Sequence, residues 1–205
     1  GGKVSVNGTV YEDADVYAFV KNNGGKVAVY KENLYKPMPG YRFIASNTDR
    51  SRYYVGELNG RSSKQAYMDA LHISESNIIN QTFHNPLGKM NGQDICIISL
   101  KEVSGNGLCC YRQVNDSDVL VLLEEQDYNE ILDETLQRIR RDFNHISGVF
   151  SINCVFRYLL FSQEHHMEDY LKTMSTLGEH AGLIGFGEHY NQQFVNQTMT
   201  CVVFE

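Results

Sequence analysis

Apolar residues recur at helical spacing in four segments of the chain. The clearest segment is residues 128–143, where they return every three or four positions and the opposite face is charged, as expected for a helix lying on a sheet. Ser62 and Gln65 have the spacing of a capping box and predict the start of an earlier helix. We expect two further helices, one that runs from about Ser74 towards the next proline and one that is capped by Ser162.

Shorter apolar runs bounded by turn residues predict roughly nine strands. Val16–Val20 and Lys26–Tyr30 flank Asn22–Gly25, and because Asn and Gly tolerate the positive φ of a tight turn, we expect a hairpin here. Residues 36–40, which include two prolines, are predicted to interrupt the strand pattern. The remaining strands are expected at residues 41–46, 52–58, 94–100, 108–112, 119–123, 149–154, 183–184 and 198–204.

The order of these elements predicts the fold class. Strands follow one another mostly in hairpin order, and the chain has roughly nine strands to about four helices. This pattern favours an α+β layered domain with a mixed or antiparallel sheet over a doubly wound parallel sheet. The length of 205 residues fits one large domain or two small ones.

Charge and cysteine usage narrow the class of protein. With 18 basic and 25 acidic residues the formal charge is −7, which argues against nucleic acid and against an anionic membrane surface as partners. No signal peptide and no run of 18 apolar residues is visible, so we expect no membrane contact by this segment. The five cysteines are odd in number and lack C-x-x-C spacing, which is typical of a reducing, cytoplasmic compartment.

A glycine-rich stretch near the C-terminus is the most distinctive candidate site. Three glycines fall within Gly182–Gly187, and Glu188 follows them directly. Such glycines let a backbone turn sharply or approach a ligand closely, so a ligand site and a plain turn at the end of a strand are both open interpretations. The spacing, and the polar loop that follows, do not fit a dinucleotide-binding fingerprint.

A second candidate lies at residues 150–157, where an apolar strand ends. Arg157 offers a planar fork of donors suited to a carboxylate or phosphate, and the alternative is an ion pair with an acidic residue elsewhere in the chain. Cys154 would be a nucleophile only with a lowered pKa and a nearby base. None of the seven histidines is joined to it by a recognisable motif, so a small core thiol is favoured and we expect no enzyme activity.

The polar stretch Glu164–Asp169 has the composition of a metal site without its geometry. On a helix, Glu164 and Glu168 share one face while His165 and Asp169 share another. The four candidate metal ligands would therefore point in two directions and could not hold one metal ion together. The H-E-x-x-H motif of zinc proteases is absent. We therefore predict a solvated helical face here with no metal, and we expect no cofactor.

Three short motifs, in order along the chain, resemble the signature of FIST domains. Gly185–Glu188 followed by Asn196–Thr198 is similar to the family's Gly-Glu pair and its Asn-Gln-Thr segment before the last strand. Val195 stands where the family usually has His, and Asn153 stands where Ser is common. The other two motifs are a Ser-Cys-x-x-Arg element at Ser151, Cys154 and Arg157, and a strand-to-helix step at Glu57–Gly60 with Ala66 and Tyr67.

The resemblance implies a domain organisation and a class of function. Residues 1–45 would be the tail of an N-terminal FIST half, and residues 46–205 would be the FIST C-terminal domain. The resemblance further implies an intracellular sensory domain of bacterial signal-transduction proteins that binds a small molecule, such as an amino acid. The implied partners are this ligand, the N-terminal FIST half and an output signalling module in the full protein.

The resemblance and the residue chemistry together give a hypothesis for the ligand site. The end of the strand near residue 154 and the glycine turn would line one pocket, in which Arg157 clamps a ligand carboxylate and Glu188 receives its ammonium group. Two alternatives stay open, a protein-interaction scaffold and a cysteine-dependent enzyme that uses Cys154. The expected ligand-binding residues are Arg157, Glu188, Asn153, Cys154, Gly187 and Asn196.

Overall fold

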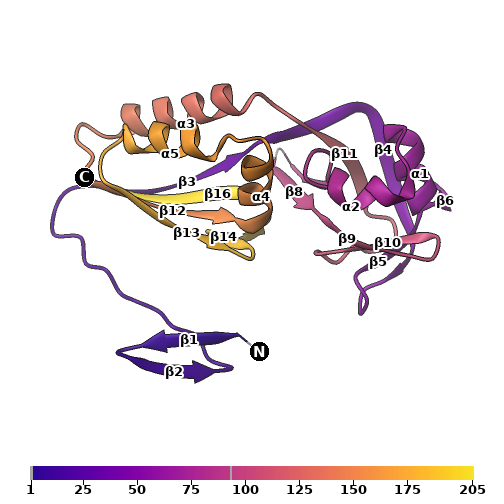
Figure 1. Ribbon diagram of the computed structural model, residues 1–205, viewed down its shortest axis with the longest axis horizontal. Coiled ribbons are helices and arrows are strands. Elements are labelled where there is room, and N and C mark those ends of the chain that lie inside the picture. The colour runs from indigo at the N-terminus through magenta and orange to yellow at the C-terminus, as the bar shows by residue number, and fades with distance from the viewer. Residues whose placement is uncertain (1, 93) are drawn as a thin grey trace.

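Two β-sheets, each with helices packed on it, form the main body of the protein (Figure 1). The computed structural model describes residues 2–92 and 94–205. Within these residues the chain forms five α-helices and sixteen strands in mixed and antiparallel sheets. The predicted α+β fold is therefore confirmed, and the strands are more numerous than the sequence led us to expect.

The first sheet has four strands. In order across the sheet, they are β13 (His180–Gly185), β12 (Gly148–Cys154), β16 (Thr198–Phe204) and β3 (Val27–Asn33). β12 and β13 are parallel, and the other neighbours are antiparallel. Figure 1 shows α3 (Tyr128–Asp142) and α5 (Met167–Ser175) on one face of this sheet, while α4 (Val155–Gln163) follows β12 directly at its end.

The second sheet has eight strands. In order they are β8 (Asp94–Ile98), β7 (Leu87–Asn91), β11 (Val119–Glu125), β4 (Tyr35–Asp49), β5 (Tyr54–Leu58), β10 (Gly107–Cys110) and β9 (Leu100–Ser104), with β6 (Arg61–Ser62) paired to β5. Its helices are α1 (Ser63–Leu71) and α2 (Ile78–Gln81), the latter preceded by the 3-10 turn η1 (Glu75–Asn77). A separate small hairpin, β14 (Glu188–Tyr190) with β15 (Gln193–Val195), joins β13 to β16.

The helices predicted from local signals are confirmed. Ser62 caps α1 by accepting a hydrogen bond from the Gln65 amide at 3.2 Å. Asp127 caps α3 by accepting the amides of Asn129 and Glu130, and the apolar stripe of this helix is buried against the first sheet. In the part of the chain that the structure describes, no helix is long and apolar enough to cross a membrane.

The predicted hairpin of residues 16–20 and 26–30 is wrong. Residues 13–26 form no strand, and β3 pairs instead with β16, which lies at the other end of the chain. The N-terminal hairpin is β1 (Lys3–Val6) with β2 (Thr9–Glu12), and it lies apart from the two sheets (Figure 1). Its turn is Asn7-Gly8, and both residues have the positive φ that a two-residue hairpin turn requires.

Two other predicted element boundaries are wrong. β4 runs through residues 36–40 without a break. Pro37 lies opposite Leu123 of β11, and Pro39 falls where the register of this ladder shifts and strand pairing is irregular. Ser162 does not cap a helix but lies within α4, where its hydroxyl donates to the carbonyl of Tyr158 at 2.7 Å. The helix predicted after Ser162 is α5, which begins at Met167.

Residues 27–45 pack with residues that follow them in the sequence. β3 completes the first sheet and β4 lies inside the second, so each strand is paired with strands from beyond residue 45. The assignment of residues 1–45 to the tail of an N-terminal half stays a prediction.

The buried side chain of Gln197 ties the two sheets together. Its carbonyl oxygen accepts a hydrogen bond from the Ser99 hydroxyl at 2.6 Å. Its amide nitrogen donates to the Tyr35 hydroxyl at 2.8 Å and to the carbonyl of Thr82 at 3.2 Å. Gln197 precedes β16 of the first sheet, whereas its three partners belong to the second sheet and its helices, so this amide fixes how the two sheets meet.

We predict that Gln197→Leu lowers the free energy of unfolding by about 2–3 kcal/mol, because it removes three hydrogen bonds and leaves buried partners unsatisfied. The matched control is Gln137→Leu on the exposed face of α3, which should change the free energy of unfolding by less than about 0.5 kcal/mol. Urea unfolding measures both. Equal stability of the two variants would contradict the prediction.

Candidate functional site

A small cavity opens where the two sheets meet. Its volume is about 160 Å³, which corresponds to roughly five water molecules of liquid volume. Ser99 and Tyr111 line it from the second sheet. From the side of the first sheet it is lined by Cys154, Val155, Phe156, Phe186, Phe194 and Asn196. Two of the six predicted site residues, Cys154 and Asn196, thus come together in one apolar-walled cavity.

Cys154 lies at the point where β12 ends and α4 begins. The nearby backbone amides of Phe156 and Gln197 act to lower the pKa of its thiol, and the Glu188 carboxyl group next to it acts to raise it. Burial, together with the nearby Glu188 carboxylate, raises the pKa of the Cys154 thiol to about 11. At neutral pH this side chain is therefore a neutral thiol.

Glu188 is the most unusual charged group near the cavity. It begins β14, is only 2% exposed, and accepts a hydrogen bond from the Thr198 hydroxyl at 3.1 Å. Burial raises the pKa of its carboxyl group to about 7, although hydrogen bonds from Thr198 and Cys154 act in the opposite direction. Its other oxygen, Oε1, is buried with no hydrogen-bond partner among the described residues.

Asn196, like Glu188, lies close to the glycine turn. Its amide nitrogen is buried and has no hydrogen-bond partner in the described part of the chain. A side chain at Gly187 would come within 2.7 Å of the Phe194 ring and 3.5 Å of Asn196, and one at Gly185 would lie 3.6 Å from Glu188 Oε1. Gly187 also has a φ of +122°, so the turn needs glycine for both its conformation and its packing.

Arg157 does not line the cavity, although the sequence suggested a clamp for a ligand carboxylate. Its side chain is 1% exposed and forms an ion pair with Glu32, which lies on β3 and is equally buried. The guanidinium group also stacks against Phe161, 4.6 Å from the ring centroid, and lies 5.5 Å from that of Tyr170. The alternative considered for Arg157, an ion pair within the chain, is what the structure contains.

Asn153 also lies in the core and does not line the cavity. Its amide nitrogen donates to the Tyr170 hydroxyl at 2.9 Å, which anchors β12 to α5. On the same strand the Ser151 hydroxyl is 2.8 Å from the imidazole Nε2 of His180. The motif residues Ser151, Asn153 and Arg157 therefore organise the interior of the first sheet, and their assignment to ligand binding stays a prediction.

Several residues of this region were not identified from the sequence. Glu32 could have been found, since Tyr30 and Glu32 occupy alternate positions of one strand and an acidic residue there faces the core. Phe194 and Tyr111 gave no such signal, because single aromatic residues are common at protein surfaces and in cores alike. Within residues 2–92 and 94–205, no group of three His, Cys, Asp or Glu side chains is placed to hold a metal ion.

The buried ion pair predicts a strong effect of truncating either partner. Arg157→Met leaves the Glu32 carboxylate uncompensated, and we expect it to lower the free energy of unfolding by about 3–5 kcal/mol. The double variant with Glu32→Gln should recover part of this loss. Lys172→Met, at the exposed pair with Glu168, is the control and should cost less than about 1 kcal/mol. Additive effects of the two core substitutions in urea unfolding would argue against the pair.

The raised pKa of Glu188 predicts a pH-dependent stability. The folded-state pKa of about 7 lies above the ordinary value of 4.5, so between these pH values the folded chain holds a proton that the unfolded chain has lost. The contribution of this Glu188 proton to stability is therefore fully present below about pH 4.5 and is lost as the pH rises to about 7.

We predict that Glu188→Gln gains stability relative to the parent chain as the pH rises from 5 to 8, by about 1–3 kcal/mol. The exposed Glu179→Gln is the matched control, and we expect it to show no such trend. Urea unfolding at several pH values measures both variants. A Glu188→Gln difference that is independent of pH would show that this carboxyl group titrates normally.

Comparison with known proteins identifies the family. A family model for the FIST C domain matches residues 64–191, which is more than half of the chain. The match includes Cys154, Arg157 and Glu188 and ends shortly before Asn196. No curated protein and no solved structure gives a significant match. FIST domains are sensory domains of signal-transduction proteins, and this chain belongs to the FIST C domain family.

Proposed function

We propose that the cavity at Cys154 and Asn196 binds a small molecule, and that the chain is a ligand-binding sensor and not an enzyme. One observation carries this proposal. Glu188 Oε1, an acceptor, and Asn196 Nδ2, a donor, are both buried without a hydrogen-bond partner among the described residues, and they flank the same glycine turn. Asn196 lines the cavity, whereas Glu188 is not part of the lining but lies next to the lining residue Cys154. Buried polar atoms in native proteins are normally paired, so these two unpaired atoms favour a ligand that pairs with them.

The chemistry of these two atoms favours an amino acid as the ligand. An ammonium group would donate to Glu188, and its positive charge would favour the ionised form of a carboxyl group whose pKa is now about 7. A ligand carboxylate would accept from Asn196. The aromatic rings of Phe156 and Phe194 would surround a small apolar side chain, and the volume of about 160 Å³ favours a ligand with few atoms.

The environment of Cys154 supports a binding role over catalysis. A thiol with a pKa of about 11 is ionised at pH 7 in on the order of one molecule in ten thousand, whereas catalytic cysteines have lowered pKa values. Burial and the Glu188 carboxyl group beside Cys154 are the causes of this raised pKa. We therefore assign Cys154 to the wall of the cavity.

The position of the cavity between the two sheets would let a bound ligand change the arrangement of the sheets. Its wall contains residues from both sheets, so a bound ligand contacts both and can favour one arrangement of the sheets over another. A neighbouring output module could respond to that difference. Ligand binding alone, with equal affinity for each arrangement, would transmit nothing.

The experiment is thermal unfolding of the chain against a panel of the common amino acids and small carboxylates. A ligand present at about 100 times its Kd should add about 2.7 kcal/mol of stability, which is a shift of a few degrees for a chain of this size. We predict such a shift with one chemical class of amino acid. No shift with any compound would contradict the proposal and would favour the interaction-scaffold alternative.

The matched variants are Asn196→Leu and Asn129→Leu. Asn196→Leu keeps the size of the side chain and removes the unpartnered amide, so it should fold normally and lose most of the ligand-induced shift. Asn129 is exposed at the start of α3, and its replacement should leave the shift intact. An unchanged shift in Asn196→Leu would place the ligand elsewhere.

A further inference from the structure

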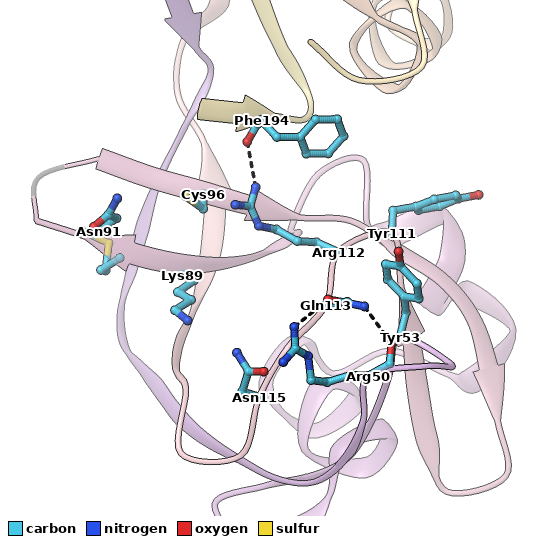
Figure 2. Close-up of a pocket in the computed structure, with 11 residues that line it drawn as sticks. Arg50, Tyr53, Lys89, Asn91, Cys96, Tyr111, Arg112, Gln113, Asn115 and Phe194 are labelled. Atoms are coloured by element: carbon cyan, nitrogen blue, oxygen red, sulfur yellow. Dashed lines mark hydrogen bonds between the residues drawn. The ribbon is translucent and has the colours of Figure 1, made fainter. Parts of the chain in front are cut away.

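A second and larger cavity lies next to the first, on the second sheet. Its volume is about 650 Å³, and Figure 2 shows the residues that line it. They come from the β7–β8 hairpin, from the turn between β4 and β5, from residues 111–115 between β10 and β11, and from Phe194 of β15. The cavity therefore lies at the same junction of the two sheets as the first one.

The lining of this cavity carries positive charge only. Arg50, Lys89 and Arg112 lie in its wall, and among the described residues that line it there is no aspartate or glutamate. The chain as a whole has a formal charge of −7, so a wall with three cations and no acid departs from the average surface. Figure 2 shows the three side chains approaching the cavity from different segments. A concave site with one sign of charge concentrates ligands of the opposite sign.

The two arginines are held in place by neutral groups. Arg112 donates to the carbonyl of Phe194 at 2.8 Å, and Arg50 donates to the side-chain oxygen of Gln113 at 3.1 Å. Gln113 returns a hydrogen bond to the Arg50 carbonyl at 3.2 Å. Within the described residues neither guanidinium group has a carboxylate at ion-pair distance. Each uses one donor in these bonds and keeps others for a ligand.

Lys89 is different, because it pairs with Asp118 at 2.5 Å. The Lys89 ammonium group, with the amide groups of Asn115, keeps the pKa of the Asp118 carboxyl group below its ordinary value against the effect of burial. The charge of Lys89 is thus largely compensated by a carboxylate just outside the cavity wall. The net positive charge of the cavity comes from Arg50 and Arg112.

We propose that this cavity binds a small oxyanion with at least two negative charges, such as a phosphate-bearing or polycarboxylate metabolite, through Arg50 and Arg112. A guanidinium fork matches the geometry of phosphate and carboxylate oxygens. Asn115 and Gln113 supply further neutral hydrogen bonds, and Tyr53 offers an aromatic wall. The volume of about 650 Å³ is in the range of cavities that hold metabolites of moderate size.

The proposed anion site is distinct from the amino-acid site and does not depend on it. Tyr111 and Phe194 line both cavities, so the two share a wall. Arg112 donates a hydrogen bond to the Phe194 carbonyl, so an anion bound by Arg112 would also affect this shared wall. The two ligands are therefore placed to influence each other's binding.

The test uses pyrophosphate and citrate as probes, each titrated into the chain by isothermal calorimetry at low ionic strength, with sodium chloride at matched ionic strength as reference. We expect saturable binding of at least one probe to one site. Binding of pyrophosphate alone identifies a phosphate-bearing ligand, and binding of citrate alone identifies a polycarboxylate. Each of these outcomes supports the site, whereas the absence of saturable binding of either probe overturns it.

Variants connect the binding to the cavity. Arg50→Gln and Arg112→Gln should each weaken binding of the probe by about tenfold or more, since each removes a charge-assisted contact. Arg42→Gln removes the same charge from an exposed position of β4 outside the cavity and should weaken binding by less than about twofold. Comparable weakening in all three variants would mean that the probe responds only to net charge, which overturns the proposal. Urea unfolding of each variant confirms that it is folded.

Discussion

The hydrogen bonds of Gln197 are the constraint on which the arrangement of the sites depends. This side chain is fully buried, and it joins the start of β16 to Ser99, Tyr35 and the end of α2. Because its amide offers both a donor and an acceptor, it can satisfy groups from several segments at once, and a misplaced partner would leave a buried polar group unpaired. Both cavities lie along the junction that these bonds hold in register.

The same short segment also supplies polar groups to the candidate site. Asn196 faces the small cavity, Gln197 holds the junction, and Thr198 donates to Glu188. Arg157 forms its ion pair with Glu32 inside the core. The buried Glu188 therefore has no ion-pair partner of its own among the described residues. Burial therefore raises the pKa of its carboxyl group to about 7, so the group is about half protonated at neutral pH.

The position of the two cavities suits a protein that converts binding into signalling. Sensory domains need a ligand that contacts parts of the structure able to move relative to one another. Here an uncharged, mostly apolar cavity and a cationic cavity share Tyr111 and Phe194, and each combines residues from both sides of the junction. Two chemically different ligands could thus act on one wall, and any coupling between them would have to be reciprocal.

The amino-acid sequence by itself determined the features that depend on near neighbours. The start of α1 at Ser62, the amphipathic α3, the α+β class and the family motifs follow from local spacing, capping and turn chemistry. Tertiary structure decided what depends on distant partners. β3 pairs with β16 and not with residues 16–20. Arg157 forms an ion pair with Glu32, which is 125 positions away in the sequence. A guanidinium group can bind a ligand or a buried carboxylate equally well, and only the tertiary structure, which brings Glu32 of β3 next to Arg157 of α4, selects between them.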